Sequence, residues 1–468
     1  MKPSSTDFVA PFEVEASALT PAAAQLGGFL AAQGTPGARV GVLAGNDPAF
    51  IVARLAVTAA EQVMVPINPT LTAAEVAYVL GDAAPIALLC DQARAESAAG
   101  AVARLPAPIP VVSLAALPAA APIPLRDAAG ATLIYTSGTT GYPKGCLRSE
   151  VQEAARAAEL TRTYGITGAD VHLIACPLAH SAPGILLRAG LAAGARTLVM
   201  PRFEAESFLA AAADTGATLF FLVPTQYARI LALPPETRAR YDLSSVRAAL
   251  VAGAPLMPEL EADLIGWLGA GVLWQFYGSS ETGTVTVLRP EDQPAHAGSV
   301  GRPAVGVELR LLDADGSPVA TGEIGEVYVR SPTVMTGYRG ATTDRPESRD
   351  GFITVGDLGR LDDDGFLYLV GRKHDTIISG GVNVYPAEVE RALAAHPAVT
   401  AAVVFGVDHP DWGQIVAAAV ATSAPTSADD LRAYLRAHLA AYKIPKAFTF
   451  VSPAELPVGP TGKPLRRR

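Results

Sequence analysis

Short apolar runs alternate along the chain with longer stretches in which polar residues interrupt alanine and leucine. The first runs, at 38–43, 63–67 and 86–90, are rich in valine, isoleucine and leucine and are bounded by turn residues, so they predict buried strands. The stretches between them, at 48–60 and 72–80, have the length and alanine content of helices. Strands that alternate with helices predict α/β layers around a largely parallel sheet.

The same alternation continues to about residue 276. Further strands are predicted at 171–176, 196–200, 218–223, 248–251 and 272–276, with helices at 204–214 and 258–269. Parallel strands end at a common edge of their sheet, and ligands of such folds bind there. The loops that follow these strands are therefore where we expect a site.

The pattern changes after residue 298. Short strand-like runs separated by turns, such as 308–312, 325–330 and 365–370, predict a small antiparallel or barrel-like piece. After a linker near 371–374, a compact α+β unit is predicted from elements at 386–396, 399–407, 428–440 and 447–451. We therefore expect a large N-terminal domain of layered α/β subdomains with the barrel-like piece, 1–372, and a small α+β C-terminal domain, 373–468.

Composition places the chain among globular enzymes. Of the 468 residues, 50% are hydrophobic and 17% are charged, which excludes a disordered chain and calls for more than one core. The net charge of −9 without a basic face argues against nucleic-acid binding. The first residues lack the apolar core of a signal peptide, and no run reaches the roughly 18 apolar residues of a membrane span. Cys90, Cys146 and Cys176 have neither metal-site nor disulfide spacing, which favours the reducing cytoplasm.

The most informative segment is 132–148, which reads TLIYTSGTTGYPKGCLR. Its apolar start leads into a turn made of Thr136, Ser137, Gly138, Thr139, Thr140 and Gly141. Free backbone N–H groups, hydroxyls and glycines in such a turn suit an anion, and Lys144 adds a charge that suits phosphate. The segment is not a Walker A loop, because Lys144 is followed by Gly145 and not by Ser or Thr. The alternative is a solvated turn with a chance lysine.

A second segment, 275–283, ends a predicted strand with an aromatic residue, a glycine, hydroxyls and a carboxylate. Tyr277 offers an apolar face on which an adenine can stack, and Ser280 offers a hydroxyl for a phosphoryl oxygen. Glu281 supplies the kind of oxygen ligand that Mg²⁺ prefers. Taken alone, such a segment is more often an ordinary structural turn.

Together these segments resemble the motifs of the adenylate-forming superfamily, which includes acyl- and aryl-CoA ligases, luciferases and the adenylation domains of peptide synthetases. The first resembles its phosphate loop, and the second its Tyr-Gly-x-Thr-Glu motif, with Ser280 at the Thr position. Val355-Gly356-Asp357-Leu358 resembles its Thr-Gly-Asp-Leu motif, 371–386 its interdomain linker, and 457–466 its Pro-x-x-x-x-Gly-Lys signature. The motifs follow the superfamily's order over roughly 38–468, and the chain is most like an acyl- or aryl-CoA ligase.

The resemblance implies a two-step reaction that uses ATP, Mg²⁺ and coenzyme A. A carboxylic acid is first joined to AMP with release of pyrophosphate, and the acyl group then passes to the CoA thiol. The catalytic residues implied are Lys463, His180, Ser280 and Glu281, with Glu281 also holding the metal. The nucleotide-binding residues implied are Thr136, Ser137, Gly138, Thr139, Thr140, Gly141, Lys144, Tyr277, Gly278, Ser280, Asp357 and Arg372.

The resemblance also implies that the C-terminal domain is mobile and turns about a hinge at His374, where relatives usually carry Asp or Lys. Lys463 would enter to bridge the acyl carboxylate and the α-phosphate in the first step only. Ser379, Gly380 and Gly381 would line a tunnel for the CoA thiol in the second step.

By the same match, the acyl pocket is expected along the loops that follow the parallel strands. The lining residues implied are His180, Phe221, Val223, Gly253, Ala254, Phe276 and Gly278. Most are apolar, and no Asp stands where amino-acid-activating domains meet an α-ammonium, so an aromatic or medium-chain aliphatic acid is favoured. His180 is otherwise a structural histidine. Arg188 is either a surface residue or a partner for a second carboxylate of the substrate.

Three other functions are weighed against a CoA ligase. An enzyme that loads a carrier-protein phosphopantetheine would differ in a docking surface, which one sequence does not reveal. A luciferase-like oxygenase would need further features, which we do not recognise in this sequence. A catalytically inactive nucleotide-binding scaffold is disfavoured by the presence of Lys144, Glu281, Asp357, Arg372 and Lys463. The partners expected are a small carboxylic acid, ATP and CoA or a carrier protein, with no nucleic acid and no membrane span; a homodimer is left open.

Overall fold

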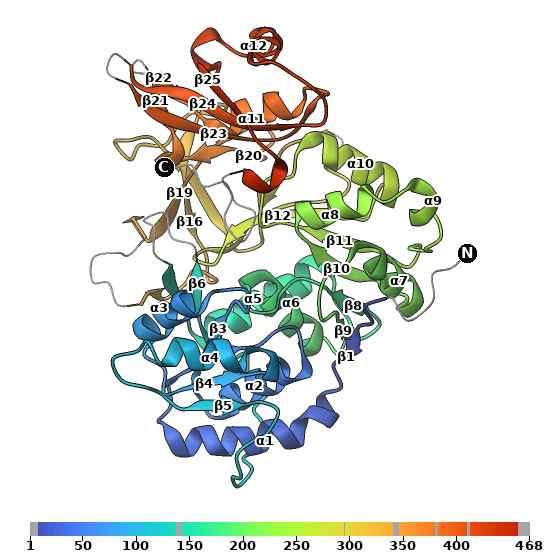
Figure 1. Ribbon diagram of the computed structural model, residues 1–468, viewed down its shortest axis with the longest axis vertical. Coiled ribbons are helices and arrows are strands. Elements are labelled where there is room, and N and C mark those ends of the chain that lie inside the picture. The colour runs from blue at the N-terminus through green and yellow to red at the C-terminus, as the bar shows by residue number, and fades with distance from the viewer. Residues whose placement is uncertain are drawn as a thin grey trace.

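The computed structural model of the chain describes residues 8–136, 143–293, 295–339, 346–379, 382–409 and 412–456. Four β-sheets organise these residues, and helices cover the two largest (Figure 1). The two large sheets lie in successive layers, and the C-terminal sheet lies at the opposite end of the molecule from the first helices (Figure 1). Among the described residues, no helix has both the length and the apolar character needed to cross a bilayer.

The first large sheet has the strand order β17-β7-β6-β3-β2-β4-β5. Its strands are β2 (Arg39–Leu43), β3 (Val63–Ile67), β4 (Ala87–Cys90), β5 (Val111–Ser113), β6 (Ala131–Thr136), β7 (Lys144–Arg148) and β17 (Gly337–Tyr338). The pairs that link β2–β6 are parallel, as predicted, whereas β7 and β17 add an antiparallel edge. β7 was not predicted, because it begins directly at Lys144 after the glycine-rich turn.

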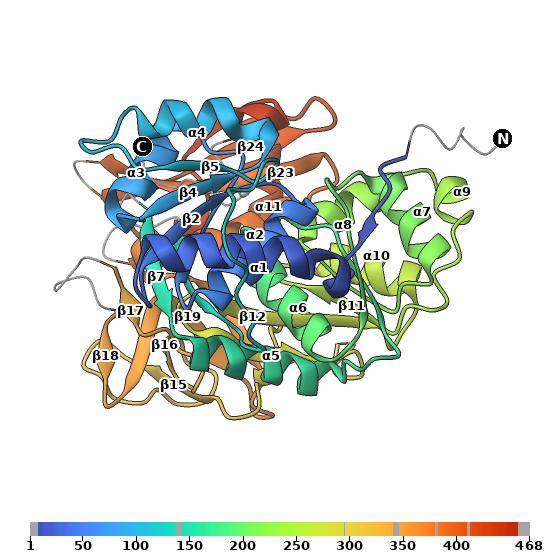
Figure 2. The same ribbon diagram turned by 90° about the horizontal axis from the view of Figure 1, so that it is seen from below.

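Alternate residues of these strands feed two cores. Val40 and Val42 face α1 (Ala16–Gln33) and α2 (Pro48–Ala59), whereas Leu88 faces α3 (Ala73–Ala83) and α4 (Ala95–Val102). A sheet buried on both faces explains why its strands read as continuous apolar runs. Figure 2 shows α1 lying across the lower face of the molecule against α2.

The second large sheet has the strand order β1-β9-β8-β10-β11-β12-β13-β14. Its strands are β1 (Phe12–Glu13), β8 (Val171–Ile174), β9 (Arg196–Val199), β10 (Leu219–Leu222), β11 (Ala248–Val251), β12 (Leu273–Ser279), β13 (Gly283–Leu288) and β14 (Arg302–Pro303). Its helices are α5 (Glu150–Tyr164), α6 (Ser181–Ala192), α7 (Ala205–Thr215), α8 (Pro224–Leu231), α9 (Pro235–Arg238) and α10 (Pro258–Leu268). β9, β8, β10, β11 and β12 are parallel, so their carboxyl ends share one edge.

Capping residues fix where several helices begin and end. Thr72 accepts a hydrogen bond from the backbone of Glu75, whose side chain accepts one in return, and this capping box begins α3 as the sequence suggests. Ser149 and Gln152 form the same arrangement at the start of α5, which ends at Gly165 in the left-handed region, φ +57°. These caps hold α5 directly after β7 and beside the second sheet.

The third sheet is antiparallel, as predicted for the region after residue 298. It contains β15 (Glu308–Leu312), β16 (Gly325–Arg330), β18 (Ser348–Arg349), β19 (Phe352–Leu361) and β20 (Leu367–Arg372). Its apolar face packs against Val285 of β13 and Val300. This contact brings the third sheet against the edge of the second sheet.

The C-terminal sheet has the order β22-β21-β24-β23, and β25 pairs with β24. Its elements are β21 (Ile377–Ser379), β22 (Val382–Val384), β23 (Val399–His409), β24 (Gly413–Thr422), β25 (Ala447–Phe450), α11 (Pro386–Ala394) and α12 (Ala428–Arg436). Short 3₁₀ turns complete the described chain at Gln92–Arg94, Lys373–Asp375, Ala441–Lys443 and Pro453–Glu455. The sequence did not predict β24, because its alanine-rich run carries little β propensity; pairing along β23 decides its conformation.

Candidate active site

Tyr277, Asp357 and Arg372 meet although they come from different parts of the chain. The Tyr277 hydroxyl donates to Asp357 Oδ2 at 2.6 Å, and Arg372 Nε donates to Asp357 Oδ1 at 3.0 Å. Asp357 and Arg372 are register partners on β19 and β20, and Tyr277 comes from β12 of the second sheet. Contact between the two sheets therefore brings together three residues that lie in three separate motifs of the sequence.

Burial and charge act together on these side chains. Burial raises the pKa of Tyr277, and the Asp357 carboxylate raises it further. Burial alone would lower the pKa of Arg372, but Asp357 and Asp375 offset that effect and raise it. The hydroxyl and the guanidinium therefore remain hydrogen-bond donors at neutral pH.

Glu281 lies beside this group and at the end of the phosphate-loop hairpin. Its Oε1 accepts hydrogen bonds from Thr136 Oγ1 at 3.3 Å and from the Tyr338 hydroxyl at 3.0 Å. Thr136 and Lys144 are register partners on β6 and β7, so the two ends of the loop between them lie side by side. Lys144 Nζ lies 5.5 Å from the centre of the Tyr338 ring. Because Thr136 and Tyr338 both bond to Glu281, the two ends of the loop lie near this carboxylate.

The two groups adjoin each other. The Glu281 carboxylate raises the pKa of Tyr277 as well as that of Tyr338, and Arg372 opposes both shifts. Tyr338 was missed by sequence reasoning, because a lone Gly-Tyr pair on a two-residue strand carries no motif. Its place is set by the pairing of β17 with β7 opposite Cys146.

Gly278 is required where β12 turns into β13. A side-chain carbon at Gly278 would come within 2.1 Å of the Gly283 carbonyl oxygen, so no larger residue fits without a backbone shift. The turn that follows is closed by Ser279, whose hydroxyl accepts from the backbone N–H groups of Glu281 and Thr282. Ser280 and Glu281 are thus held on a structured turn.

The residues expected at the acyl pocket gather at the shared edge of the parallel strands. Phe221 is the residue before the last of β10, and Phe276 lies in the middle of β12 with its ring centre 5.8 Å from that of Phe221. Gly253 follows β11 in the left-handed region, φ +89°, and a carbon added there would lie 3.5 Å from Val223. Ala254 is the next residue of that loop.

His180 lies at the same edge, after β8 and directly before α6. Its backbone is extended, and its carbonyl accepts from Gly184 in the first turn of the helix. Arg188, two turns further along α6, lies 3.6 Å from the carboxylate of Asp127. The pairing gives Arg188 a partner within the protein.

Several predicted residues fall outside the described residues: Ser137, Gly138, Thr139, Thr140, Gly141, Gly380, Gly381 and Lys463. Ser379 ends β21 and is buried. His374 lies in the turn between β20 and β21, exposed to solvent, and its ring approaches Gly356, the residue before Asp357. The expected hinge therefore lies against the strand that carries Asp357.

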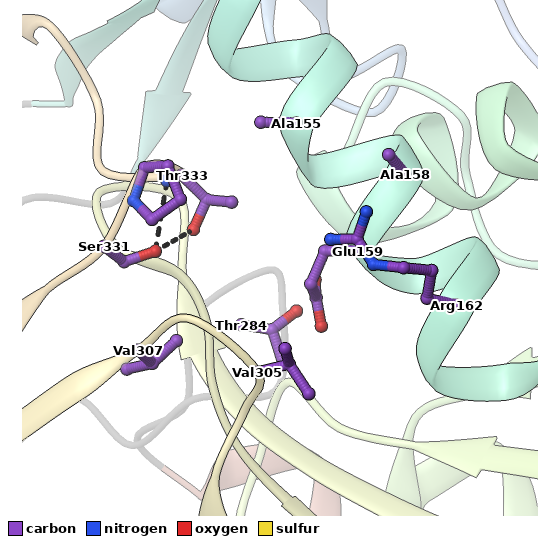
Figure 3. Close-up of a pocket in the computed structure, with 10 residues that line it drawn as sticks. Ala155, Ala158, Glu159, Arg162, Thr284, Val305, Val307, Ser331 and Thr333 are labelled. Atoms are coloured by element: carbon purple, nitrogen blue, oxygen red, sulfur yellow. Dashed lines mark hydrogen bonds between the residues drawn. The ribbon is translucent and has the colours of Figure 1, made fainter.

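A small hollow lies elsewhere, between α5 and the loops beside β13 (Figure 3). It has a volume of about 160 Å³ and is lined by Ala155, Ala158, Glu159, Arg162, Thr284, Val305, Val307, Ser331, Pro332 and Thr333. Ligand pockets for drug-sized molecules usually measure about 300–1,000 Å³, so this hollow is too small for a nucleotide. It also contains none of the residues that the sequence singled out.

The surroundings of Glu281 fit a magnesium ion. Its carboxylate is largely buried, 8% exposed, and both recorded partners are neutral hydroxyl donors. Mg²⁺ is usually held by one or two carboxylates together with substrate phosphates and water. Glu281 is the residue that would hold the ion, which would neutralise charge on bound phosphates.

Comparison with known proteins identifies the family. The family described as AMP-binding enzyme matches residues 17–339, and the AMP-binding enzyme C-terminal domain matches residues 388–463. The chain belongs to the AMP-binding enzyme family. Feruloyl-CoA synthase from Amycolatopsis sp is similar at 36% identity over 452 residues, which covers 94% of this chain and 89% of that protein. The 2-succinylbenzoate–CoA ligase of Bacillus licheniformis is 35% identical, covering 74% of this chain and 70% of that protein.

Solved structures of AMP-binding enzymes have the same fold. The o-succinylbenzoate-CoA synthetase of Bacillus subtilis with its acyl-adenylate intermediate superposes with a TM-score of 0.86 at 30% identity, covering 96% of this chain and 92% of that chain. An amide bond synthetase from Marinactinospora thermotolerans superposes with a TM-score of 0.87 at 33% identity, covering 96% and 93%. These likenesses confirm the predicted fold class and the adenylate-forming resemblance.

The predicted activity is confirmed at the level of reaction class. This AMP-binding enzyme is an ATP-dependent, AMP-forming acid–thiol ligase of the acyl- or aryl-CoA synthetase type, which works through an acyl-adenylate. Its co-substrates and metal are ATP, coenzyme A and Mg²⁺, and the Bacillus subtilis relative has been solved with ATP and magnesium.

Proposed function

We propose that this AMP-binding enzyme activates an apolar carboxylic acid, aromatic or medium-chain aliphatic, and transfers it to CoA. The observation that carries the proposal is the apolar wall of Phe221, Phe276 and Val223 at the carboxyl edge of the parallel strands. Packing against such a wall favours substrates with apolar surface. The similarity to feruloyl-CoA synthase supports an aromatic acid within this class.

The nucleotide is proposed to bind where the two polar groups adjoin. Asp357 and Arg372 would meet the ribose hydroxyls, since an ionised carboxylate accepts two donors at once. Tyr277 and Gly278 would line the adenine. The loop from Thr136 to Lys144 would surround the β- and γ-phosphates, and Ser280 would donate to a phosphoryl oxygen beside the metal ligand Glu281.

The first step is attack of the substrate carboxylate on the α-phosphorus, with pyrophosphate as the leaving group. The protein contributes orientation and charge stabilisation at the reacting oxygens. We assign Lys463 to bridge the acyl carboxylate and the α-phosphate in this step. His180 is assigned to the boundary between the acyl pocket and the nucleotide, where it gates the pocket or packs against the substrate.

The second step is attack of the CoA thiol on the mixed anhydride, with AMP leaving. One arrangement does not serve both steps, because Lys463 must leave before a thiol path opens. We propose that 373–468 form a domain that turns relative to 1–372 about His374, and that Ser379, Gly380 and Gly381 then line the thiol path. The position of His374 between two sheets supports this hinge.

Two finer points belong to the same proposal. The acceptor is CoA rather than a carrier protein or an amine, because feruloyl-CoA synthase and 2-succinylbenzoate–CoA ligase, at 36% and 35% identity to this chain, are named as enzymes that act on CoA. The compartment is the cytoplasm, because the three cysteines are free and buried, as expected of a protein folded under reducing conditions.

The experiment is a panel of acids with Mg²⁺ and ATP, in which pyrophosphate release is measured. The panel holds substituted cinnamates, benzoates, medium-chain fatty acids, 2-succinylbenzoate, sulfoacetate and amino acids. Cinnamates, benzoates or medium-chain acids are expected to give the highest kcat/KM. Preference for an amino acid or a dianion contradicts the apolar pocket, and no release with any acid contradicts adenylation.

The acceptor is tested with the best acid. CoA, a phosphopantetheinylated carrier protein and a simple amine are each added, and the products are weighed by mass spectrometry. An acyl-CoA is expected. An acylated carrier or an amide formed in preference to acyl-CoA contradicts the proposed acceptor.

A further inference from the structure

A buried arginine lies behind the turn that carries Ser280 and Glu281. Arg148, the last residue of β7, is fully buried, with no exposed surface. Its Nε donates to the Ser280 carbonyl at 2.8 Å, one terminal nitrogen donates to the same carbonyl, and the other donates to the carbonyl of Thr333. Arg148 ends the segment 132–148, but the sequence does not indicate its role, because its partners are main-chain atoms far along the chain.

The contacts of Arg148 belong to a set that holds three successive carbonyls of the turn. Cys146 Sγ also donates to the Ser280 carbonyl at 3.0 Å. The backbone N–H of Met335 donates to the Glu281 carbonyl at 2.8 Å, and the Thr333 hydroxyl donates to the Thr282 carbonyl at 3.0 Å. β7 and the segment 331–335 therefore fix the main chain from which Ser280 and Glu281 project.

The energetic cost of this arrangement is large for a purely structural contact. Burying a guanidinium removes it from water, and here burial lowers the pKa of Arg148 to about 10. Within the described residues, Arg148 forms no ion pair at contact distance; its bonds are to main-chain carbonyls. An apolar side chain of similar volume would fill the space without that cost. What only the guanidinium supplies is a planar fork of donors that fixes two carbonyls at once.

We propose that Arg148 is a positioning residue for adenylation: its guanidinium fixes the Ser280 carbonyl, and so sets where the Ser280 hydroxyl and the Glu281 carboxylate meet ATP and Mg²⁺. The inference rests on the roles assigned to Ser280 and Glu281 under the proposed function. Arg148 itself touches neither substrate nor metal. It acts through the turn, in the way that residues behind a metal ligand set the ligand's orientation.

The test compares Arg148→Lys and Arg148→Met with the wild type in the two half-reactions. Lysine keeps the charge but loses the fork, and methionine keeps only the stem. Adenylation is measured as pyrophosphate release over a range of MgATP and Mg²⁺ concentrations. Thioester formation is measured from CoA and chemically prepared acyl-AMP, which requires neither the pyrophosphate nor the metal.

For Arg148→Lys, kcat/KM for MgATP is expected to fall about 10–100-fold, the usual effect of losing a residue behind a metal ligand, with a higher Mg²⁺ requirement. Thioester formation from acyl-AMP is expected to change much less. Thr333→Val, which removes the bond to the Thr282 carbonyl, should shift MgATP dependence in the same direction by a smaller factor. Thr333→Val also tests the positioning of the turn if Arg148→Met does not fold.

Arg247 provides the matched control. It donates to the main-chain carbonyls of Tyr164 and Gly165 and pairs with Asp170, far from the turn. Arg247→Met is expected to lower the melting temperature without changing the MgATP dependence. An equal loss in both half-reactions for Arg148→Lys, or a loss of melting temperature alone, overturns the proposal.

The affinity of each protein for MgATP, measured by calorimetry without any acid, separates this proposal from the proposed function. If the wild type binds MgATP but adenylates no acid, the proposed substrate class fails, and weaker MgATP binding by Arg148→Lys still supports the positioning role. Unchanged MgATP binding by Arg148→Lys contradicts the positioning role, whatever acid the wild type uses.

Discussion

The nucleotide side and the acyl side of the candidate site are built in different ways. On the nucleotide side, polar side chains from separate sheets are joined by hydrogen bonds, as in Tyr277–Asp357–Arg372. On the acyl side, apolar side chains such as Phe221 and Phe276 come from two strands of one sheet, β10 and β12, which flank β11. The first depends on contact between sheets and on directional bonds, and the second on local packing. Substitutions on the nucleotide side should therefore strongly reduce the use of ATP, and substitutions on the acyl side should change the preference among acids by smaller factors.

The largest expected effect concerns Lys463, which we propose bridges the acyl carboxylate and the α-phosphate in the first step. Lys463→Ala should slow pyrophosphate release about 10²–10³-fold, the usual effect of removing one group that stabilises transition-state charge. Thioester formation from supplied acyl-AMP should remain near the wild-type rate, because the lysine serves the first step only. Equal slowing of both half-reactions, measured under single-turnover conditions, would falsify the two-step domain alternation.

The next largest effect is expected from a substitution of Asp357, the residue that joins Tyr277 and Arg372 on the nucleotide side. Asp357→Asn keeps the shape but removes the charge that Arg372 and the Tyr277 hydroxyl share. Loss of a charge-assisted hydrogen bond costs about 1.5–3 kcal/mol, so kcat/KM for ATP should fall about 10–100-fold while the ranking of acids stays the same. The matched control is Asp170→Asn, which also removes a carboxylate paired with an arginine, Arg247, but away from the site. A changed ranking of acids in Asp357→Asn would contradict the inference that the nucleotide side and the acyl side act independently.

The sheet behind the acyl side contains a polar group without partners. His172 of β8 is fully buried, both ring nitrogens lack hydrogen bonds, and burial lowers its pKa from 6.5 to about 4. The folded state therefore favours neutral His172. The contribution of this histidine to the free energy of unfolding is fully present above pH 6.5 and decreases as the pH falls toward 4. At pH 5 the loss amounts to about 2 kcal/mol by linkage.

His172→Leu removes this titration. The free energy of unfolding of the variant, measured with urea, should fall less than that of the wild type between pH 7.5 and pH 5. Parallel pH profiles for the two proteins would show that His172 does not contribute, since all other titrating groups are common to both.

The smallest expected effect sharpens the acyl side. Phe276→Leu removes part of the apolar wall and should lower kcat/KM for an aromatic acid about tenfold, within the range of roughly 1–3 kcal/mol for small changes in an apolar pocket. The KM for ATP should not change. Phe208→Leu is the matched control, because Phe208 of α7 is a buried aromatic of the same core that packs on Phe220. Equal losses in the two variants would show a general effect on packing.

Sequence reasoning succeeded where the chemistry is written in contiguous residues. The strand that ends at Thr136, the strand that carries Tyr277 before Glu281 and the antiparallel strands after residue 298 were predicted, and the structure contains them. It failed for Tyr338 and Arg148. Each acts on a motif from a strand distant in sequence. Tyr338 stands in no local pattern, and Arg148, although it ends the segment 132–148, carries no sign there of its partners.

The roles of the site residues stay predictions for a related reason. Asp357 and Arg372 were assigned separately to the ribose, and the structure brings both to Tyr277 by pairing β19 with β20 and packing that sheet on β12. Lys463 and the centre of the phosphate loop lie outside the described residues, so their assignments still derive from the family match. The hinge role of His374 likewise stays a prediction that comes from the family resemblance.

By itself, the sequence determined the layers of helix and strand, the reaction class and the identity of the polar residues, because periodicity and short motifs are local properties of a chain. Only the tertiary structure decided which of those residues meet. Arg148 donates a hydrogen bond to the Ser280 carbonyl, and the Tyr338 hydroxyl donates one to the Glu281 carboxylate. These partners meet because buried polar atoms need hydrogen-bond partners and the packing of separate sheets brings them together.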